Sequence, residues 1–232
     1  MTAMPAPPST WPRPRGLLLD AMGTLIGLRS SVGNTYAAVA AEHGLDVAAD
    51  AIDRAFPGVL RQAPTLAFPG LEGDSLLQAE RRWWGERIDA VLGAAGAAAA
   101  PAALHDALFD RFADPSLWHV YADVPAVLRR WHGAGLRLAV VSNFDRRLQP
   151  LLEGLGLADL FAAVVVSSSA GAAKPSPLPF QIALESLDLP PSQVWHVGDS
   201  PEDGAGARAA GVRCLLVQRP CGRECWPAEP WV

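Results

Sequence analysis

The chain has 232 residues, of which 50% are hydrophobic and 19% are charged, as expected for a globular protein with one large domain or a domain carrying an insert. Asp and Glu (24) outnumber Lys and Arg (19), and the formal net charge is −5. No basic run or stripe interrupts this acidity, which argues against a nucleic-acid partner. Any phosphate site must therefore be local, built from a few side chains and backbone amides.

The first segment, residues 1–15, is rich in proline and lacks the apolar stretch of a secretory signal. We predict a disordered tail there, which leaves organellar targeting open. The most membrane-like segment, residues 90–104, consists mostly of Ala and Gly and lacks the length and large apolar side chains of a membrane span. A cytoplasmic protein without a membrane partner is expected.

Five short apolar runs have the composition of strands that are buried on both faces of a parallel sheet. They cover residues 16–20, 136–143, 162–167, 194–199 and 212–217. Four of these runs end in polar residues, namely Asp20, Ser142 with Asn143, Ser167, and Asp199. Open α/β sheets bind ligands at the carboxyl ends of their strands, so we expect these side chains to meet at one edge.

Helical patterns separate the strands, at residues 125–132, 146–155, 180–187 and 202–210. Between Asp20 and Leu136 no strand pattern is evident. Four helices are predicted in that interval, at residues 32–44, 48–59, 76–92 and 102–112. Trp83 and Trp84 are predicted to pack in the core of this helical segment, as large aromatic residues at helical spacing usually do.

The alternation of strands and helices predicts an α/β fold with a Rossmann-like parallel sheet. Its core would comprise residues 16–27 and 121–220, and residues 28–120 would form an all-helical cap inserted after the first strand. Residues 221–232 show no pattern and are predicted to be an irregular tail. The three cysteines, Cys214, Cys221 and Cys225, offer no zinc spacing and are predicted to be reduced thiols.

Three segments near the predicted sheet edge carry groups suited to binding a phosphate. The turn after the first strand, with Gly23 and Thr24, can present the Asp20 carboxylate and line up backbone amides, although an aspartate before a turn is also a common cap. Ser142 and Asn143 supply a hydroxyl and amides. Lys174 lies in a proline-rich loop, whose restricted backbone would hold the ammonium group in place.

Two carboxylates, Asp199 and Asp203, lie where the fourth predicted strand passes into a helix. Together with Asp20 they offer the oxygen ligands that Mg²⁺ prefers, and the ion would screen an anionic substrate from an anionic nucleophile. Asp203 would also favour the N-terminus of the helix. His196, within the same strand, is predicted to be a hydrogen-bonded core residue.

The order of these motifs resembles the haloacid dehalogenase-like superfamily over residues 15–217. The matching residues are Asp20-x-x-Gly23-Thr24-Leu25, Ser142-Asn143, Lys174-Pro175, and Gly198-Asp199-Ser200 with Asp203. The resemblance is particularly close in residues 135–148.

The resemblance implies a mechanism in which Asp20 attacks a small phosphorylated molecule and becomes an aspartyl phosphate. Ser142 and the Asn143 amide would hold the transferring oxygens, and Lys174 would neutralise charge. The implied Mg²⁺ ligands are Asp20, the Met22 carbonyl and Asp199, with Asp203 orienting ligands or water.

Met22 departs from the family pattern, because related phosphatases carry a second aspartate at that position as general acid and base. A thioether transfers no proton, and such catalysis contributes roughly 10²–10⁴-fold. Three interpretations remain open. The chain is a phosphohydrolase that uses a good leaving group or an acid from the cap such as Glu72 or Asp74, or it is a catalytically impaired phosphate-binding or regulatory protein, or it is a 2-haloacid dehalogenase. We rank them in that order, since Gly198-Asp199-Ser200 favours magnesium whereas dehalogenases need no metal.

Overall fold

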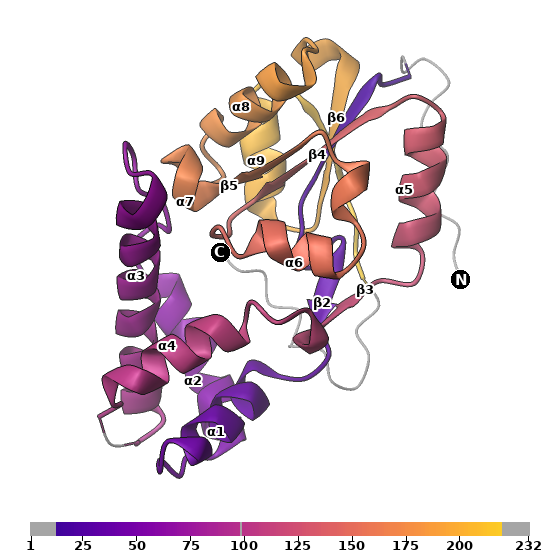
Figure 1. Ribbon diagram of the computed structural model, residues 1–232. Coiled ribbons are helices and arrows are strands. Elements are labelled where there is room, and N and C mark those ends of the chain that lie inside the picture. The colour runs from indigo at the N-terminus through magenta and orange to yellow at the C-terminus, as the bar shows by residue number, and fades with distance from the viewer. Residues whose placement is uncertain (1–12, 98, 220–232) are drawn as a thin grey trace.

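A computed structural model describes residues 13–97 and 99–219, which fold around a five-stranded sheet (Figure 1). The strand order is β5 (Ala163–Val166), β4 (Arg137–Ser142), β1 (Gly16–Leu19), β6 (Val194–Gly198) and β7 (Arg213–Leu216). Every neighbouring pair in this sheet is parallel. The predicted α/β class and the five predicted strands are therefore confirmed. The predicted tails lie wholly or largely outside the described residues, as do Cys221 and Cys225, and the thiol of Cys214 is free.

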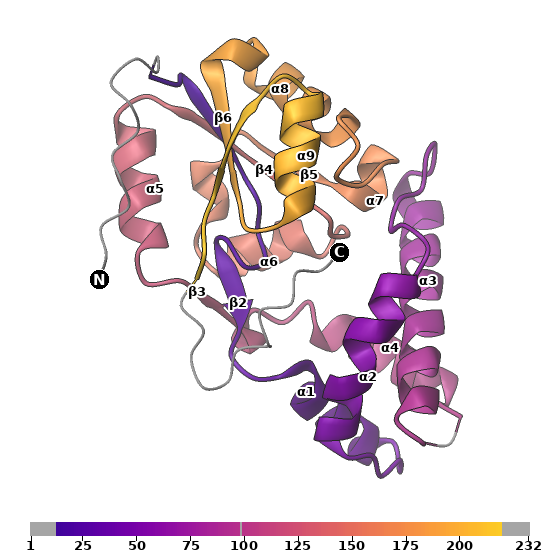
Figure 2. The same ribbon diagram turned by 180° about the vertical axis from the view of Figure 1, so that it is seen from behind.

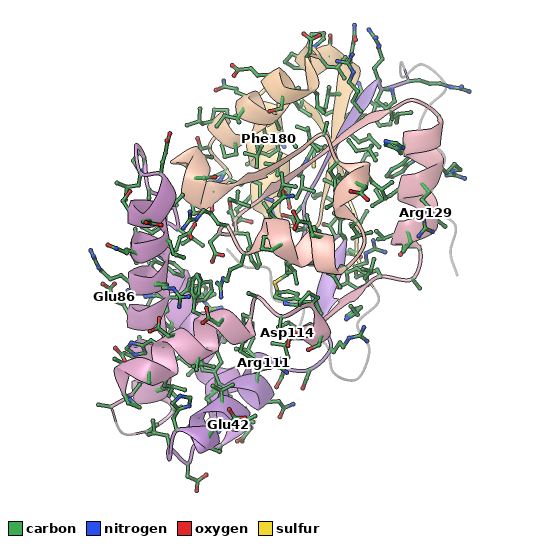
Figure 3. All side chains as sticks on the ribbon, in the orientation of Figure 1. Glu42, Glu86, Arg111, Asp114, Arg129 and Phe180 are labelled. Carbon is green, nitrogen blue, oxygen red and sulfur yellow. The ribbon has the colours of Figure 1, made fainter. Side chains whose placement is uncertain are left out.

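Successive residues of the central strands face opposite sides of the sheet and join two separate cores. Leu17 and Leu19 pack into one core, and Leu18 packs into the other. Helices α5 (Val124–Gly133) and α6 (Leu148–Gly154) cover the first face, and α8 (Leu178–Leu187) and α9 (Pro201–Ala209) cover the second (Figures 1 and 2). Phe180, labelled in Figure 3, is fully buried in the second core.

Short elements complete this part of the chain. A four-residue helix, α7 (Ser167–Ala170), follows β5 directly. Three 3-10 turns, η1 (Pro115–Leu117), η2 (Ala158–Leu160) and η3 (Pro191–Gln193), precede β3 (Trp118–Val120), β5 and β6.

Four helices connect β2 (Ile26–Leu28) to β3 and build a third core of their own. They are α1 (Val32–Glu42), α2 (Ala49–Gln62), α3 (Gly73–Ala94) and α4 (Ala102–Arg111), and we call them the helical insert. Tyr36, Ile52 and Ile88 are among the buried residues of its core. α3 lies beside α7, so the insert reaches the edge of the sheet where β5 ends (Figures 1 and 2). Among the described helices, none combines the length and hydropathy that crossing a membrane requires.

The prediction that no strand lies between Asp20 and Leu136 is wrong. β2 (Ile26–Leu28) and β3 (Trp118–Val120) form an antiparallel ribbon, with Gly27 opposite His119. Each strand has three residues, too few for an alternation of polar and apolar side chains to stand out. The ribbon carries the chain into and out of the helical insert. The division into a core and a cap at residues 28 and 120 stays a prediction.

Candidate active site

Asp20 follows β1 directly and opens a tight turn at the carboxyl edge of the sheet. The carbonyl of Ala21 accepts hydrogen bonds from the backbone N–H groups of Leu25 (2.8 Å) and Ile26 (3.0 Å), while the Gly23 N–H donates to the Ile26 carbonyl (2.9 Å). The Asp20 side chain is buried, at 6% exposure. The turn therefore fixes the carboxylate at the end of a buried strand instead of leaving it on a mobile loop.

Gly23 permits this turn for two reasons. Its φ of +83° lies in the left-handed region that favours glycine, and a Cβ there would come within 2.3 Å of Asp199 Oδ2. Gly135 offers a matched comparison, because it has φ +82° but nothing within 4 Å of its Cβ position.

On the prediction that this edge of the sheet binds Mg²⁺, we expect Gly23→Ala to abolish that binding, since the methyl group would displace the Asp199 carboxylate. Gly135→Ala should suffer a similar backbone strain, which lowers the free energy of unfolding by roughly 1–2 kcal/mol, but its Mg²⁺ affinity should equal that of the wild type. Titration calorimetry with MgCl₂ and thermal unfolding of both variants would check this. Equal Mg²⁺ affinity in the two variants would contradict the argument.

Two donors hold one oxygen of Asp20. The Ser142 hydroxyl, at the end of β4, donates to Asp20 Oδ1 over 3.0 Å, and Lys174 Nζ donates to the same oxygen over 2.6 Å. Lys174 Nζ also donates to the Val141 carbonyl at 3.1 Å. All three side chains are buried, at 3–6% exposure. The structure thus brings together the predicted nucleophile, the predicted hydroxyl and the predicted ammonium group.

The side chain of Asn143 is engaged by the backbone of Lys174. Asn143 Oδ1 accepts from the Lys174 N–H (2.8 Å), and Asn143 Nδ2 donates to the Lys174 carbonyl (3.0 Å). The carboxamide therefore positions the loop that carries Lys174. The sequence placed Asn143 at the site but gave no signal for this particular use of its side chain.

Asp203 is fully buried and accepts five hydrogen bonds. Its Oδ1 accepts from Lys174 Nζ (2.6 Å) and His196 Nε2 (2.7 Å). Its Oδ2 accepts from the N–H groups of Asp199 (3.2 Å) and Ser200 (3.1 Å) and from the Ser200 hydroxyl (2.7 Å). In return, the Ser200 oxygen accepts from the Asp203 N–H and caps α9. Asp203 therefore fixes Lys174 and the Asp199 backbone.

His196 is buried as predicted, with an edge-to-face contact to Phe180. Its Nε2 bonds Asp203, whereas its Nδ1 has no partner among the described residues. With a proton on Nε2, the ring donates a hydrogen bond to Asp203 Oδ1 and so helps to hold that carboxylate in place.

The charges of this cluster stabilise one another. Burial alone would lower the pKa of Lys174, but the neighbouring carboxylates of Asp20 and Asp203 outweigh it and raise that pKa above its usual range. Burial would raise the pKa of Asp203, but the hydrogen bond from His196 and the charge of Lys174 lower it well below its usual range. Lys174 is therefore a cation and Asp203 an anion near neutral pH.

Asp199 differs from the other two carboxylates because, within the described residues, no cationic side chain is hydrogen-bonded to it. Its Oδ1 accepts from the Thr24 hydroxyl at 3.0 Å. Partial burial and then the charge of Asp20 raise the pKa of Asp199 to about 7. Ligand oxygens of Asp20, Asp199 and Asp203 lie within 4.8 Å of one another. Three clustered carboxylates, one of them short of positive charge, fit a hard divalent cation such as Mg²⁺.

This electrostatic arrangement predicts a pH-dependent affinity for Mg²⁺. Below pH 7 a cation must displace the proton of Asp199, so affinity should fall up to about tenfold per pH unit and level off above pH 7. Calorimetric titration with MgCl₂ on both sides of pH 7 would measure this. Asp199→Asn should bind Mg²⁺ weakly and lose the slope, whereas a wild-type affinity that does not change with pH would contradict the assignment.

Met22 lies in the turn after Asp20, and its side chain is 39% exposed. The other proton donors considered from the sequence, Glu72 and Asp74, lie at the start of α3 with exposed side chains. Among the described residues no hydrogen bond joins either of them to Asp20. In the described part of the chain, neither acid is therefore held beside the nucleophile by a hydrogen bond, and the residue at position 22 itself is a thioether that transfers no proton.

One group of residues at this edge was not recognised from the sequence. Asp145 and Arg147 follow β4 closely and are buried, and Trp84 of α3 donates to Asp145 over 2.6 Å. The sequence feature that could have pointed to this group is the run of three charged residues at positions 145–147, shortly after the end of a buried strand. The contact to Trp84 could not be inferred, because it depends on where the insert packs.

The comparison with protein families decides the assignment, because the family model described as haloacid dehalogenase-like hydrolase matches residues 14–211. The chain belongs to this family. It is 41% identical to the Bos taurus haloacid dehalogenase-like hydrolase domain-containing protein 3, over 89% of this chain and 82% of that one. The predicted family resemblance is confirmed.

Phosphatases and a dehalogenase are among the proteins that this chain resembles. The chain is 36% identical to a phosphoserine phosphatase of Thermus thermophilus, over 51% of this chain and 49% of that one. CbbY of Rhodobacter sphaeroides in complex with phosphate superposes with a TM-score of 0.62, at 20% identity over 94% of this chain and 92% of that one. An L-2-haloacid dehalogenase of Xanthobacter autotrophicus superposes with a TM-score of 0.62, at 23% identity over 88% of this chain and 77% of that one. The two structural likenesses show the fold alone, and phosphatases are among the relatives by sequence.

Proposed function

We propose that this hydrolase is a Mg²⁺-dependent phosphohydrolase that acts on a small phosphorylated metabolite through an aspartyl phosphate at Asp20. The observation that carries the proposal is the environment of that carboxylate. Lys174 and Ser142 hold one oxygen of Asp20, and the Asp199 carboxylate lies beside it in a cluster suited to a divalent cation. A dianionic phosphoryl group needs positive charge here, and Lys174 supplies one part of it.

In the proposed reaction, a carboxylate oxygen of Asp20 attacks phosphorus, and the bond from phosphorus to the leaving oxygen breaks. Water then attacks phosphorus in the aspartyl phosphate, the bond from phosphorus to the Asp20 oxygen breaks, and phosphate leaves while the Asp20 carboxylate is restored. The proton lost by the water passes to the released phosphate or to solvent. Ser142 and the backbone amide of Asn143 would bind phosphoryl oxygens, since the Asn143 carboxamide is occupied. The backbone amides of Gly23 and Thr24, which the sequence suggested for this role, donate instead to the carbonyls of Ile26 (2.9 Å) and Ala21 (3.3 Å) within the turn. Bound Mg²⁺ would neutralise phosphoryl charge, with Asp20, Asp199 and the Met22 carbonyl as its ligands and Asp203 orienting them.

Met22 determines which class of phosphorylated substrate we expect to react fastest. The leaving oxygen departs with a negative charge, and the site has no carboxylic acid at this position to protonate it. Phosphorylated compounds with a stable leaving anion, such as aryl phosphate esters or acyl phosphate anhydrides, should therefore react far faster than alkyl phosphates. The helical insert would act as the cap that selects among them.

A second candidate function is a phosphate-binding or regulatory protein whose catalysis is impaired, and Met22 is the observation that favours it. The dehalogenase alternative shares this missing acid. It is disfavoured by the cluster of three carboxylates, which a displacement of halide does not require.

The proposal is tested by incubating the purified protein with p-nitrophenyl phosphate, acetyl phosphate and 2-chloropropionate, each with MgCl₂ or with EDTA. Magnesium-dependent release of phosphate would support the phosphohydrolase. Binding of inorganic phosphate without turnover would favour the impaired protein, and magnesium-independent release of chloride would favour the dehalogenase.

A further inference from the structure

A buried charged junction joins the helical insert to the loop after β4. Asp145, fully buried, accepts from the Arg147 backbone N–H (3.1 Å) and Nε (2.8 Å) through Oδ1, and from Arg147 Nη2 (2.6 Å) through Oδ2. The guanidinium of Arg147 is itself 8% exposed. Asp145 and Arg147 lie two and four residues after Asn143.

The insert supplies the remaining partners of that pair. Trp84 Nε1 of α3 donates to Asp145 Oδ2 at 2.6 Å, and Arg147 Nη1 donates to the Phe109 carbonyl of α4 at 2.9 Å. The guanidinium carbon of Arg147 lies 5.0 Å from the centre of the Trp84 ring and 4.0 Å from that of Phe109. Both α3 and α4 are thus bonded to the same buried ion pair.

A second ion pair, between Glu80 and Arg146, also joins the helical insert to the loop after β4. Glu80 of α3 is fully buried, and its two carboxylate oxygens accept from the backbone N–H and the Nε of Arg146, each at 3.2 Å. A buried charge is costly unless it is paired and hydrogen-bonded. These contacts therefore specify one position of the insert against the loop.

The same short loop is bonded to the site at its other end. Ser142 donates to Asp20, the Asn143 carboxamide binds the Lys174 backbone, and the Phe144 carbonyl accepts from the Ser167 hydroxyl at 3.2 Å. Four consecutive residues are thus tied, in order, to the nucleophile, to the lysine loop, to the start of α7 and to the insert.

We propose that Asp145 and Trp84 are positioning residues that couple the placement of the helical insert to the phosphate-binding loop. The insert then does more than cover the site, because its docking sets the position of Ser142 and of the Asn143 amide. The inference rests on the proposed function for its effect on phosphate binding. Its structural part, the coupling of insert and loop, is measurable without turnover.

The chain offers a matched pair of variants for the test. Trp84→Phe removes the N–H that crosses to Asp145, and Trp83→Phe removes an N–H that donates to the Pro64 carbonyl within the insert at 2.9 Å. Both retain an aromatic ring. We expect Trp84→Phe to weaken the binding of inorganic phosphate with MgCl₂, and to raise KM for p-nitrophenyl phosphate, by about tenfold, the size of one hydrogen bond to a charged group. Trp83→Phe should change both by less than about twofold, whatever its effect on Tm.

Hydrogen exchange provides the readout that is independent of activity. In Trp84→Phe, the amides of residues 143–147 should exchange faster than in wild type, and in Trp83→Phe they should not. Equal exchange of this loop in the two variants would overturn the coupling. If the wild type neither binds phosphate nor turns over p-nitrophenyl phosphate, the proposed function fails, and the exchange comparison still decides the coupling.

Discussion

Asp20→Asn should abolish magnesium-dependent release of p-nitrophenol from p-nitrophenyl phosphate, with a loss of at least about 10³-fold, as expected when an enzyme loses its nucleophile. An amide oxygen cannot form the aspartyl phosphate. The fold should persist, because Asn keeps the volume of the side chain and Lys174 stays paired with Asp203 at 2.6 Å. Initial rates over a range of enzyme concentrations, with thermal unfolding of each variant, would measure this.

Asp53→Asn is the matched control for this change. Asp53 accepts the Gly33 N–H at 2.7 Å between α1 and α2, so its replacement alters a carboxylate of the insert and not of the proposed site. It should keep wild-type kcat. Residual turnover in Asp20→Asn above about 0.1% of wild type, the level left by a 10³-fold loss, would point to another nucleophile or to a contaminating phosphatase.

The sheet and the polar groups at its edge were predictable because each depends on local sequence. The runs ending at Asp20, Ser142 and Asp199 are mainly apolar, interrupted by Arg137 in the second and His196 in the third, and this composition is typical of parallel strands covered on both faces. Parallel strands also bring their carboxyl ends to one edge. Local pattern therefore sufficed to predict which side chains meet.

Other features depend on contacts between distant segments, and no local pattern encodes them. The β2–β3 ribbon joins residues about ninety positions apart through strands of three residues each. The occupation of the Asn143 carboxamide by the Lys174 backbone depends on how two loops pack. Likewise, the sequence suggested Asp203 as a metal-site residue, whereas the structure shows both of its oxygens engaged by Lys174, His196, Ser200 and the Asp199 backbone.

Met22→Asp should raise turnover of alkyl phosphates such as glycerol phosphate by about 10²–10⁴-fold, the usual contribution of a positioned general acid and base. The position suits such a residue, because Met22 lies two residues after Asp20 in the same fixed turn and its side chain is 39% exposed. The gain should be smaller for p-nitrophenyl phosphate, whose leaving anion needs no proton. Comparing kcat/KM for the two substrates would measure it.

Met22→Asn is the decisive control, because it has the shape and polarity of the aspartate without its proton. A gain confined to Met22→Asp means that proton transfer was the missing function and that the rest of the site is competent. An equal gain in both variants would contradict this and would mean that the methionine side chain obstructs the substrate. If wild type is inert and Met22→Asp is active, Asp20, Lys174 and Asp199 form a working phosphoryl-transfer site that this chain uses for binding instead of turnover.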